Sequence, residues 1–223
     1  MGVVDKCIGV LTVLEDGPMA LAELVAATGL SRPTAHRLAV ALESHSLVRR
    51  DDDGRFVLGL RLVALGRAAS DGLPLAERAG PALEALRDET GESAQLYVAD
   101  GNQRVCVAAL ESPHGLRTIV RLGASLPLDR GSAGKVLRAE PNVLARGWAD
   151  SVEEREAGVA SVSAPIFDVA GRVHAAIGVS GPVERTSRTP GRRYAKAVVR
   201  AARAVEAATG WAGGPASPVP KRR

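Results

Sequence analysis

Hydrophobic residues in the first 45 positions recur every three or four residues, a spacing typical of amphipathic helices. Glycine and proline interrupt this pattern at Gly17-Pro18 and again at Gly29. Ser31 lies where a helix N-cap is expected, and Pro33 fits a first turn because its missing N–H needs no partner there. The pattern therefore predicts three helices with these buried stripes: Val4, Ile8, Leu11 and Leu14; Leu21, Leu24 and Val25; Ala35, Leu38, Ala39 and Leu42.

The period changes after residue 46. Two short β-like runs, Leu47–Arg50 and Arg55–Leu58, flank Asp51-Asp52-Asp53-Gly54, and an Asp-Gly turn between such runs is typical of a hairpin. Three helices followed by a hairpin is the element order of a winged helix-turn-helix, whose third helix enters the major groove of DNA. We therefore predict such a domain in residues 1–59.

Basic and hydroxyl side chains gather on the third helix and on both legs of the hairpin. No acidic residue lies between Leu24 and Leu42. For any one arginine, an ordinary solvated helix face is the simpler interpretation, but the order of elements favours DNA binding. The candidate DNA-binding residues are Ser31, Arg32, Thr34, His36, Arg37, Arg49, Arg50 and Arg55.

The second half begins with a linker helix at 60–72, whose inward side we predict to be Leu62, Leu65 and Ala69, and Asp71-Gly72-Leu73-Pro74 breaks it. Beyond that break, a helix runs through Leu75–Leu86 to Gly91. The remaining pattern predicts strands at 93–99, 103–110, 116–122, 159–167 and 173–180, a loop with a short helix at 123–139, and a final helix at 194–208. Antiparallel strands with helices packed on them indicate an α+β domain at 73–210. Residues 211–223 are expected to form a flexible basic tail.

Composition excludes several classes of function. The chain has 223 residues, of which 46% are hydrophobic and 3% aromatic, so it offers no stacking platform for single-stranded nucleic acid. It has no run of about 18 apolar residues, and its first residues lack a signal cleavage site. We therefore expect a cytoplasmic protein without a membrane partner.

Charge and cysteine content change the picture little. The net charge of +4 supports nucleic-acid binding only weakly, because residues 185–223 hold ten basic side chains and one acidic one. Cys7 and Cys106 have no CxxC or Cys/His partner, so we expect buried free thiols and neither a disulfide nor a zinc site.

The second half contains no recognisable catalytic set. Its histidines are far apart, and Gly131-Ser132-Ala133-Gly134-Lys135 lacks the spacing and the Ser or Thr of a phosphate loop. We therefore expect no catalytic residue, no metal site and no cofactor. The hydroxyls of Ser151, Ser161, Ser163 and Ser180 lie on or next to predicted strands, where they bind either the polar end of a small ligand or nearby backbone.

Four stretches resemble the IclR family of bacterial transcriptional regulators: residues 4–59 (VDKC to FVLG), 116–137 (LRTIVRLGASLPLDRGSAGKVL), 146–168 (RGWADSVEEREAGVASVSAPIFD) and 175–188 (AAIGVSGPVERTSR). Three shorter stretches, LVAATGLSRPTAHRLAVALE, TGESAQLY and REAGVASVSAPI, also resemble an actinobacterial branch of amino-acid-dependent growth regulators and leucine-biosynthesis repressors.

The resemblance implies a winged helix that binds palindromic operator DNA as a homodimer, often as a dimer of dimers. It also implies a GAF-like α/β effector-binding domain with an antiparallel sheet, joined to the winged helix by the linker helix. The effector would be a small carboxylate or related metabolite, held by the loop at Leu126–Gly134 and by the central strands. The candidate effector-binding residues are Ser132, Gly134, Ser151, Ser161, Ser163 and Ser180.

The chain departs from the family pattern at several positions. Ser151 lies where many members have Asp, Ser161 where many have Cys, and Gly178 where some have a second serine. Glyoxylate- or pyruvate-type specificity is therefore not carried over. Only residues 140–145 separate the loop helix from Arg146, where relatives usually carry a further helix.

The sequence thus indicates a ligand-responsive DNA-binding transcriptional regulator, a repressor of amino-acid metabolism genes, and not an enzyme. Two alternatives stay open: a small-molecule enzyme with an accessory helical domain, which would turn over a substrate, and a ligand-binding scaffold that never contacts DNA.

Overall fold

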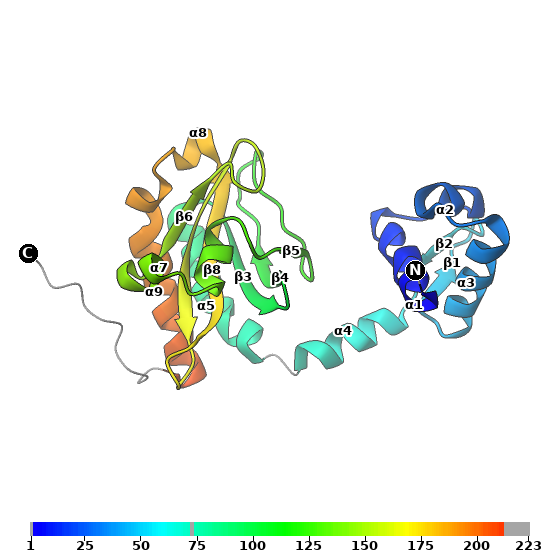
Figure 1. Cartoon of the computed structure of the whole chain (residues 1–223), viewed down its shortest axis with the longest axis horizontal. Coiled ribbons are helices and arrows are strands. Elements are labelled where there is room, and N and C mark those ends of the chain that lie inside the picture. The colour runs from blue at the N-terminus through cyan, green and yellow to red at the C-terminus, as the bar shows by residue number, and fades with distance from the viewer. Residues whose placement is uncertain (1, 72–73, 212–223) are drawn as a thin grey trace, which may run out of the picture. The chain divides into compact units, whose positions relative to one another are not determined.

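The computed structural model describes residues 2–71 and 74–211, and the chain separates into two compact units, Met1–Leu73 and Pro74–Arg223 (Figure 1). The tail expected at 211–223 falls outside the described residues except for Trp211, as does Gly72 of the expected linker.

The first unit has the predicted order of three helices and a hairpin. Its elements are α1 (Val3–Val13), a 3-10 turn (Leu14–Asp16), α2 (Leu21–Thr28), α3 (Arg32–Ser44), β1 (Val48–Arg50), β2 (Phe56–Leu58) and α4 (Arg61–Asp71). β1 and β2 pair antiparallel, with Arg49 opposite Val57. These elements are those of a winged helix-turn-helix.

The core of this unit lies between the three helices and the hairpin. Phe56 is fully buried, and its backbone exchanges two hydrogen bonds with Met19 (2.9 and 2.8 Å), which ties the hairpin to the turn before α2. A side chain at Gly59 would collide with the backbone of Ser46 and Leu47, so only glycine fits where the chain leaves β2. The buried residues are Val10, Leu14, Leu24, Ala35, Ala39, Leu42, Val48 and Phe56.

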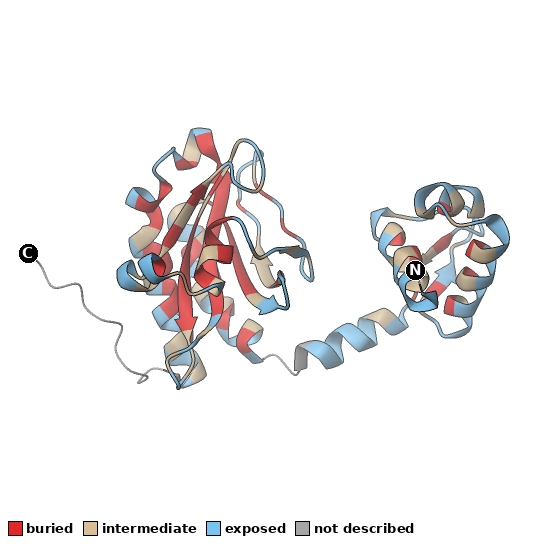
Figure 2. Cartoon of the chain, viewed as in Figure 1, coloured by how far each residue is buried: buried red, intermediate tan, exposed pale blue. Residues whose placement is uncertain are grey.

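Helix α4 does not bury the side that the sequence predicted. Most of α4 is exposed (Figure 2). Leu62 is half-buried, whereas Leu65 and Ala69 are exposed. The prediction of a buried side was therefore wrong for Leu65 and Ala69. The described part of the first unit packs no other element over these two side chains. Leu60 and Val63 are exposed as well, at 73% and 61%.

The second unit is built on a six-stranded antiparallel sheet. The strand order is β5-β4-β3-β8-β7-β6. Its elements are α5 (Pro74–Thr90), β3 (Ser93–Asp100), β4 (Gln103–Leu110), β5 (Ser125–Pro127), α6 (Ser132–Leu137), α7 (Pro141–Arg146), β6 (Ala149–Val152), β7 (Val159–Phe167), β8 (Val173–Pro182), α8 (Val183–Thr186) and α9 (Pro190–Thr209).

The two faces of the sheet are covered differently. Helices α5 and α9 pack on one face, where alternate strand residues such as Leu96, Ile177 and Ile166 form the larger core (Figure 1). The short helices α6 and α7 pack on the other face against Tyr97 and Ala176. Because α6 and α7 are too short to cover that whole face, polar side chains and a pocket occupy the rest of it.

Three predictions from the sequence are corrected, two in this unit and one, for Cys7, in the first unit. Residues 116–122 form no strand: Thr118 and Val120 are buried, and the carbonyl of Thr118 accepts a hydrogen bond from Ser93 Oγ (2.6 Å) in place of a strand ladder. The sequence analysis missed β5, β6, α7 and α8, which are only three to six residues long. Cys106 is buried as expected, but Cys7 is only half-buried; both are free thiols.

Candidate nucleic-acid interface and ligand pocket

Ser31 and Thr34 lie together at the start of α3. Ser31 has the extended backbone of an N-cap residue, but its hydroxyl accepts no backbone N–H and donates to Thr34 Oγ1 (2.9 Å). Arg32, His36 and Arg37 follow on the exposed side of the same turns. This end of α3 therefore presents two hydroxyls, an imidazole and two guanidinium groups to solvent, a set suited to base edges and phosphates.

The arginines of the first unit fall into two groups. The guanidinium groups of Arg32, Arg37 and Arg49 make no ion pair within the ranges that the structure describes. Arg50 instead lies over the Phe56 ring (4.3 Å to its centroid), donates to Gly54 O (3.2 Å) and pairs with Glu43. The first three guanidinium groups therefore have no ion-pair partner in the described residues, whereas Arg50 supports the hairpin.

Arg55 is also committed within the hairpin. Its backbone N–H and Nε donate to Asp51 (2.9 and 3.0 Å), and its Nη2 lies 3.2 Å from Asp53. Desolvation raises the pKa of Asp51, but the hydrogen bonds from Arg55 outweigh it and hold that pKa below its usual value. The guanidinium of Arg55 is thus held at the tip of the hairpin by two of its three aspartates.

The second unit contains a pocket on the face that α6 and α7 only partly cover. About 430 Å³ of non-atom space lies there, part of which is open solvent at the mouth of the pocket. Its lining comes from β3, β4, β6, β7, β8, α6 and the loop that joins β6 to β7: Gln95, Tyr97, Arg104, Gly131, Ser132, Ala133, Ser151, Arg155, Glu156, Val159, Ser161, Ser163, Val179 and Ser180.

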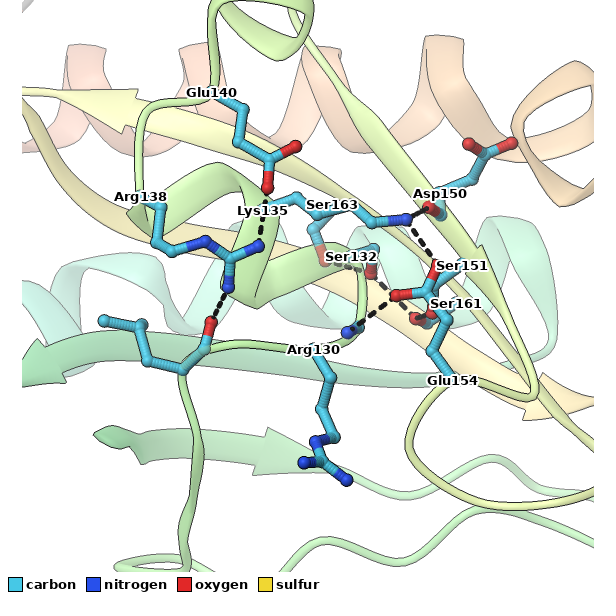
Figure 3. Close-up of polar contacts among 12 residues, drawn as sticks. Arg130, Ser132, Lys135, Arg138, Glu140, Asp150, Ser151, Glu154, Ser161 and Ser163 are labelled. Atoms are coloured by element: carbon cyan, nitrogen blue, oxygen red, sulfur yellow. Dashed lines mark hydrogen bonds and ion pairs between the residues drawn. The ribbon is translucent and has the colours of Figure 1, made fainter. Parts of the chain in front are cut away.

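Four serines are linked into a chain of hydroxyls along one wall. Ser132 Oγ lies 2.7 Å from Ser161 Oγ and 2.8 Å from Ser163 Oγ, and Ser161 Oγ lies 3.1 Å from Ser151 Oγ (Figure 3). The register causes this, because Ser151 and Ser161 are directly opposite each other on β6 and β7. Side chains at opposite positions of paired strands share one face of the sheet.

The other two candidate effector-binding residues are placed differently. Ser180 lines the pocket opposite Ser161, but its hydroxyl donates to Gln95 Oε1 (3.2 Å) and does not join the hydroxyl chain. Gly134 does not line the pocket. Its role is steric, since a Cβ there would overlap the carbonyl of Leu128 and lie 3.1 Å from Arg104 Nη1.

Arg104 is the main residue of the pocket that the sequence analysis missed. It is 3% exposed, its Nη1 donates to Pro127 O and to Arg130 O (2.7 Å), and its guanidinium faces the Tyr97 ring at 5.5 Å. Burial lowers its pKa, and the neighbouring Arg155 lowers it further. The alternation of β4 could have revealed it, because Arg104 shares a face with buried Cys106.

A carboxylate from the loop after β6 closes one end of the hydroxyl wall. Glu154 accepts hydrogen bonds from the backbone N–H of Gly131 (3.0 Å) and from Lys135, and Lys135 Nζ also donates to Asp150 O (3.0 Å; Figure 3). These contacts attach the first turn of α6 to the outer strand. The charged stretch at 153–156 is therefore a tether as well as a solvated turn.

The chemistry of the pocket fits binding. Its lining holds hydroxyls, an amide, two guanidinium groups and the carboxylate of Glu156, and no histidine, lysine or cysteine of the described residues lines it. The described residues also contain no group of three His, Cys, Asp or Glu side chains positioned to hold a metal ion. No helix within the described ranges is long and apolar enough to cross a membrane.

Sequence models of known families match both units. The model of the IclR helix-turn-helix domain matches residues 3–52, and that of the bacterial transcriptional regulator IclR C-terminal domain matches residues 67–143 and 141–207. The C-terminal match breaks at α7, the short segment where the sequence already departed from the family pattern.

Curated relatives cover most of the chain. The glycerol operon regulatory protein of Streptomyces coelicolor is 30% identical over 82% of this chain and 86% of its own length. The transcriptional repressor IclR of Escherichia coli is 24% identical over 87% of this chain and 84% of its own length.

Solved structures share the fold. IclR of Thermotoga maritima superposes with a TM-score of 0.74 at 23% identity, covering 93% of this chain and 98% of that chain. An IclR homologue of Microbacterium hydrocarbonoxydans in complex with 4-hydroxybenzoate gives 0.75 at 20% identity with the same coverage. The chain therefore belongs to the IclR family of DNA-binding transcriptional regulators.

Proposed function

We propose that this protein is an effector-responsive repressor that contains no catalytic site. The observation that carries the proposal is a pocket lined by linked hydroxyls and a buried guanidinium, in the same chain as a helix whose exposed arginines are free of ion pairs. A relative named as a repressor supports repression as the mode of action.

The regulated genes are proposed to serve amino-acid metabolism. This assignment rests on the stretches LVAATGLSRPTAHRLAVALE, TGESAQLY and REAGVASVSAPI, which resemble amino-acid-dependent regulators. Branched-chain amino acids, methionine and their 2-oxo precursors are therefore the first effectors to test. Glycerol metabolites belong in the same panel, because one relative is named for a glycerol operon.

The working form is proposed to be a homodimer, with a dimer of dimers as the larger form. Exposed apolar side chains on α1, on α4 and directly before α4 support this. Between 49% and 73% of each is exposed in the single chain: Val3, Val4, Ile8, Leu60, Val63 and Leu65. A single winged helix also offers too small a surface for specific affinity, whereas two related by a two-fold axis read two half-sites.

The DNA contacts are proposed to follow the two groups of arginines. Arg37, Thr34 and Ser31 would contact base edges or phosphates from α3, and Arg32 and Arg49 would hold the DNA backbone beside it. Arg50 and Arg55 would act mainly by shaping the hairpin, since each has partners within it. His36 lies exposed on the same helix and is a secondary contact.

An electrophoretic mobility shift on the DNA upstream of the protein's own gene tests the proposal. We expect a specific shift that changes when metabolites recovered from the natively purified protein, identified by mass spectrometry, are added back. A protein that retards no upstream DNA would be a ligand-binding scaffold. Chemical conversion of the recovered metabolite would indicate an enzyme.

A further inference from the structure

Arg104 is a buried cation without a counter-ion. It is 3% exposed, and no carboxylate of the described residues lies within ion-pair distance of it. Its charged neighbours are Arg155 and Arg138, which lower its pKa, and Asp129, which raises it but forms no ion pair with it. Burying an unpaired guanidinium is costly, so its position in a pocket calls for an anion from outside the chain.

The hydrogen bonds of Arg104 leave one edge of the guanidinium without partners. Nη1 donates to the carbonyls of Pro127 and Arg130, whereas Nε is buried with no hydrogen-bond partner among the described residues. Nε and Nη2 together form the edge that holds a carboxylate with two parallel bonds. Arg185 of the same chain shows that geometry, with Nε and Nη2 at 2.6 and 2.7 Å from Glu92.

Two glycines keep space around this guanidinium. A Cβ at Gly131 would lie 3.3 Å from Arg104 Nη2 and 4.0 Å from Ser151 Oγ. Gly131 therefore lies between Arg104 and the hydroxyl wall, and its lack of a side chain leaves the space between them open. Gly134 leaves room on the Nη1 side. The motif Gly-Ser-Ala-Gly, which does not fit a phosphate loop, thus fits around a guanidinium.

From this geometry we propose that Arg104 is the anion receptor and specificity-determining residue of the pocket: it binds the carboxyl group of a small effector at its Nε/Nη2 edge. The rest of the effector then meets the hydroxyls of Ser132, Ser161 and Ser151. The same guanidinium holds the carbonyls of Pro127 and Arg130, so anion binding acts directly on the loop that leads into α6. This inference deepens the proposed function. Only its claim about the effect of the ligand on DNA binding rests on that function.

The alternative is that Arg104 only holds the loop at 127–130 together. The two roles differ in one measurable quantity, the preference of the pocket for a carboxylate over the neutral amide of the same molecule. A loop clamp affects both ligands alike. An anion receptor discriminates between them, because two charge-assisted bonds contribute about 10- to 100-fold in affinity.

The test uses calorimetry on the full-length protein with 2-oxoisovalerate, 4-methyl-2-oxopentanoate and 4-hydroxybenzoate, each compared with its primary amide. We expect the parent to prefer at least one carboxylate over its amide by about 10-fold or more. Arg104→Met should lose that preference while still binding the amide, which shows that the pocket is folded. Arg104→Lys should keep a reduced preference, because it retains the charge but not the two-bond geometry.

Arg172→Met is the matched control. Arg172 is exposed in the turn between β7 and β8, so its loss removes one positive charge without altering the pocket. The inference is overturned if Arg104→Met keeps the preference, if the parent binds amides as tightly as carboxylates, or if no carboxylate binds at millimolar concentration.

A mobility shift in the same buffers separates this inference from the proposed function. If a carboxylate binds through Arg104 but does not change operator affinity, Arg104 is the anion receptor and the proposed control of DNA binding by the effector is refuted. If only a neutral amide releases the operator, the control of DNA binding by an effector is supported and the role of Arg104 as anion receptor is refuted.

Discussion

Ser163 Oγ fills the space beside Gly178, its direct partner across β7 and β8. A Cβ at Gly178 would overlap both that hydroxyl and the carbonyl of Val162. A flexible side chain can move aside, but a strand carbonyl that belongs to a ladder cannot. Gly178 therefore cannot carry the serine that some relatives have there, and Ser163 supplies a hydroxyl from the neighbouring strand.

This packing predicts that Gly178→Ala destabilises the protein by about 1–3 kcal/mol, the usual cost of overpacking a core. Urea denaturation of the full chain measures the change. Gly66→Ala is the control, since a Cβ at that position in α4 meets nothing within 4 Å. It should stabilise the helix by about 0.5–1 kcal/mol, and similar losses for both variants would contradict the packing argument.

Operator binding should depend on α3. Arg37→Ala is expected to weaken it by about 1–3 kcal/mol, the discrimination that one two-bond contact to guanine provides. Fluorescence anisotropy with labelled operator measures this, with circular dichroism to verify folding. An unchanged affinity would remove this helix from the interface.

Arg55→Ala is the comparison for Arg37→Ala, because Arg55 is engaged by Asp51 and Asp53. We expect Arg55→Ala to weaken operator binding less than Arg37→Ala does.

Operator binding should also depend on salt. If a dimer neutralises six to ten phosphates, the logarithm of the binding constant should fall with the logarithm of the salt concentration at a slope of roughly −5 to −9.

The pocket serines should control the response to the ligand without controlling DNA contact. Ser161→Val and Ser180→Val should leave the operator affinity of the ligand-free protein within a factor of a few. The effect of the identified ligand on that affinity should shrink about tenfold or more. The reason is that a hydrogen bond to a charged group contributes about 1.5–3 kcal/mol. Ser125→Val, at an exposed position of β5, is the control. A double valine variant that binds the ligand as tightly as the parent would place the site elsewhere.

The protein should be a dimer at micromolar concentration. Light scattering should report about twice the 23.1 kDa of one chain. Ile8→Glu and Val63→Glu place a charge on exposed apolar positions of α1 and α4 and should shift the mass toward one chain. Val169→Glu changes an equally exposed residue in a β-turn and should not. A parent mass near 23.1 kDa would contradict dimerisation.

The hairpin should lose stability in acid through Asp51. The pKa of Asp51 is lower in the folded protein than in the unfolded chain, where it is near 4. The stability that Asp51 contributes is therefore present above about pH 4 and is lost as pH falls through the pKa of the folded protein. Denaturation of the parent and of Asp51→Asn should therefore give different stabilities at pH 6, and this difference should close below about pH 4. Asp52→Asn, at the exposed tip, should show no such closing difference.

Asp168 forms the same turn in the second unit. Asp51 accepts hydrogen bonds from the backbone N–H groups of Asp53 and Arg55. Asp168 accepts the equivalent hydrogen bonds from Ala170 and Arg172. Each aspartate also binds the guanidinium of the arginine four residues later. Such a turn is visible in the sequence as Asp-x-x-Gly-Arg, because all its hydrogen bonds are local.

Local interactions explain what the sequence determined by itself. Helical spacing and the breaks at glycine and proline identified α1, α2, α3, α5 and α9. Turn residues identified the hairpins β1/β2, β3/β4 and β7/β8. Each of these elements depends on residues a few positions apart. The same spacing identified Leu75, Ala79, Leu83 and Leu86 as the buried side of α5. The order of these elements was enough to predict the winged helix and the α+β class.

Tertiary structure decided what depends on residues far apart in the chain. The alternation of Leu116–Leu122 resembles a strand, but the carbonyl of Thr118 pairs with the side chain of Ser93, so no ladder forms. Arg104 joins Ser132, Ser151 and Ser161 in one pocket only because β4, α6, β6 and β7 meet on one face of the sheet. A one-dimensional pattern indicates which side chains point inward, but strand order and register determine which of them meet, and here they bring a buried cation to a wall of hydroxyls.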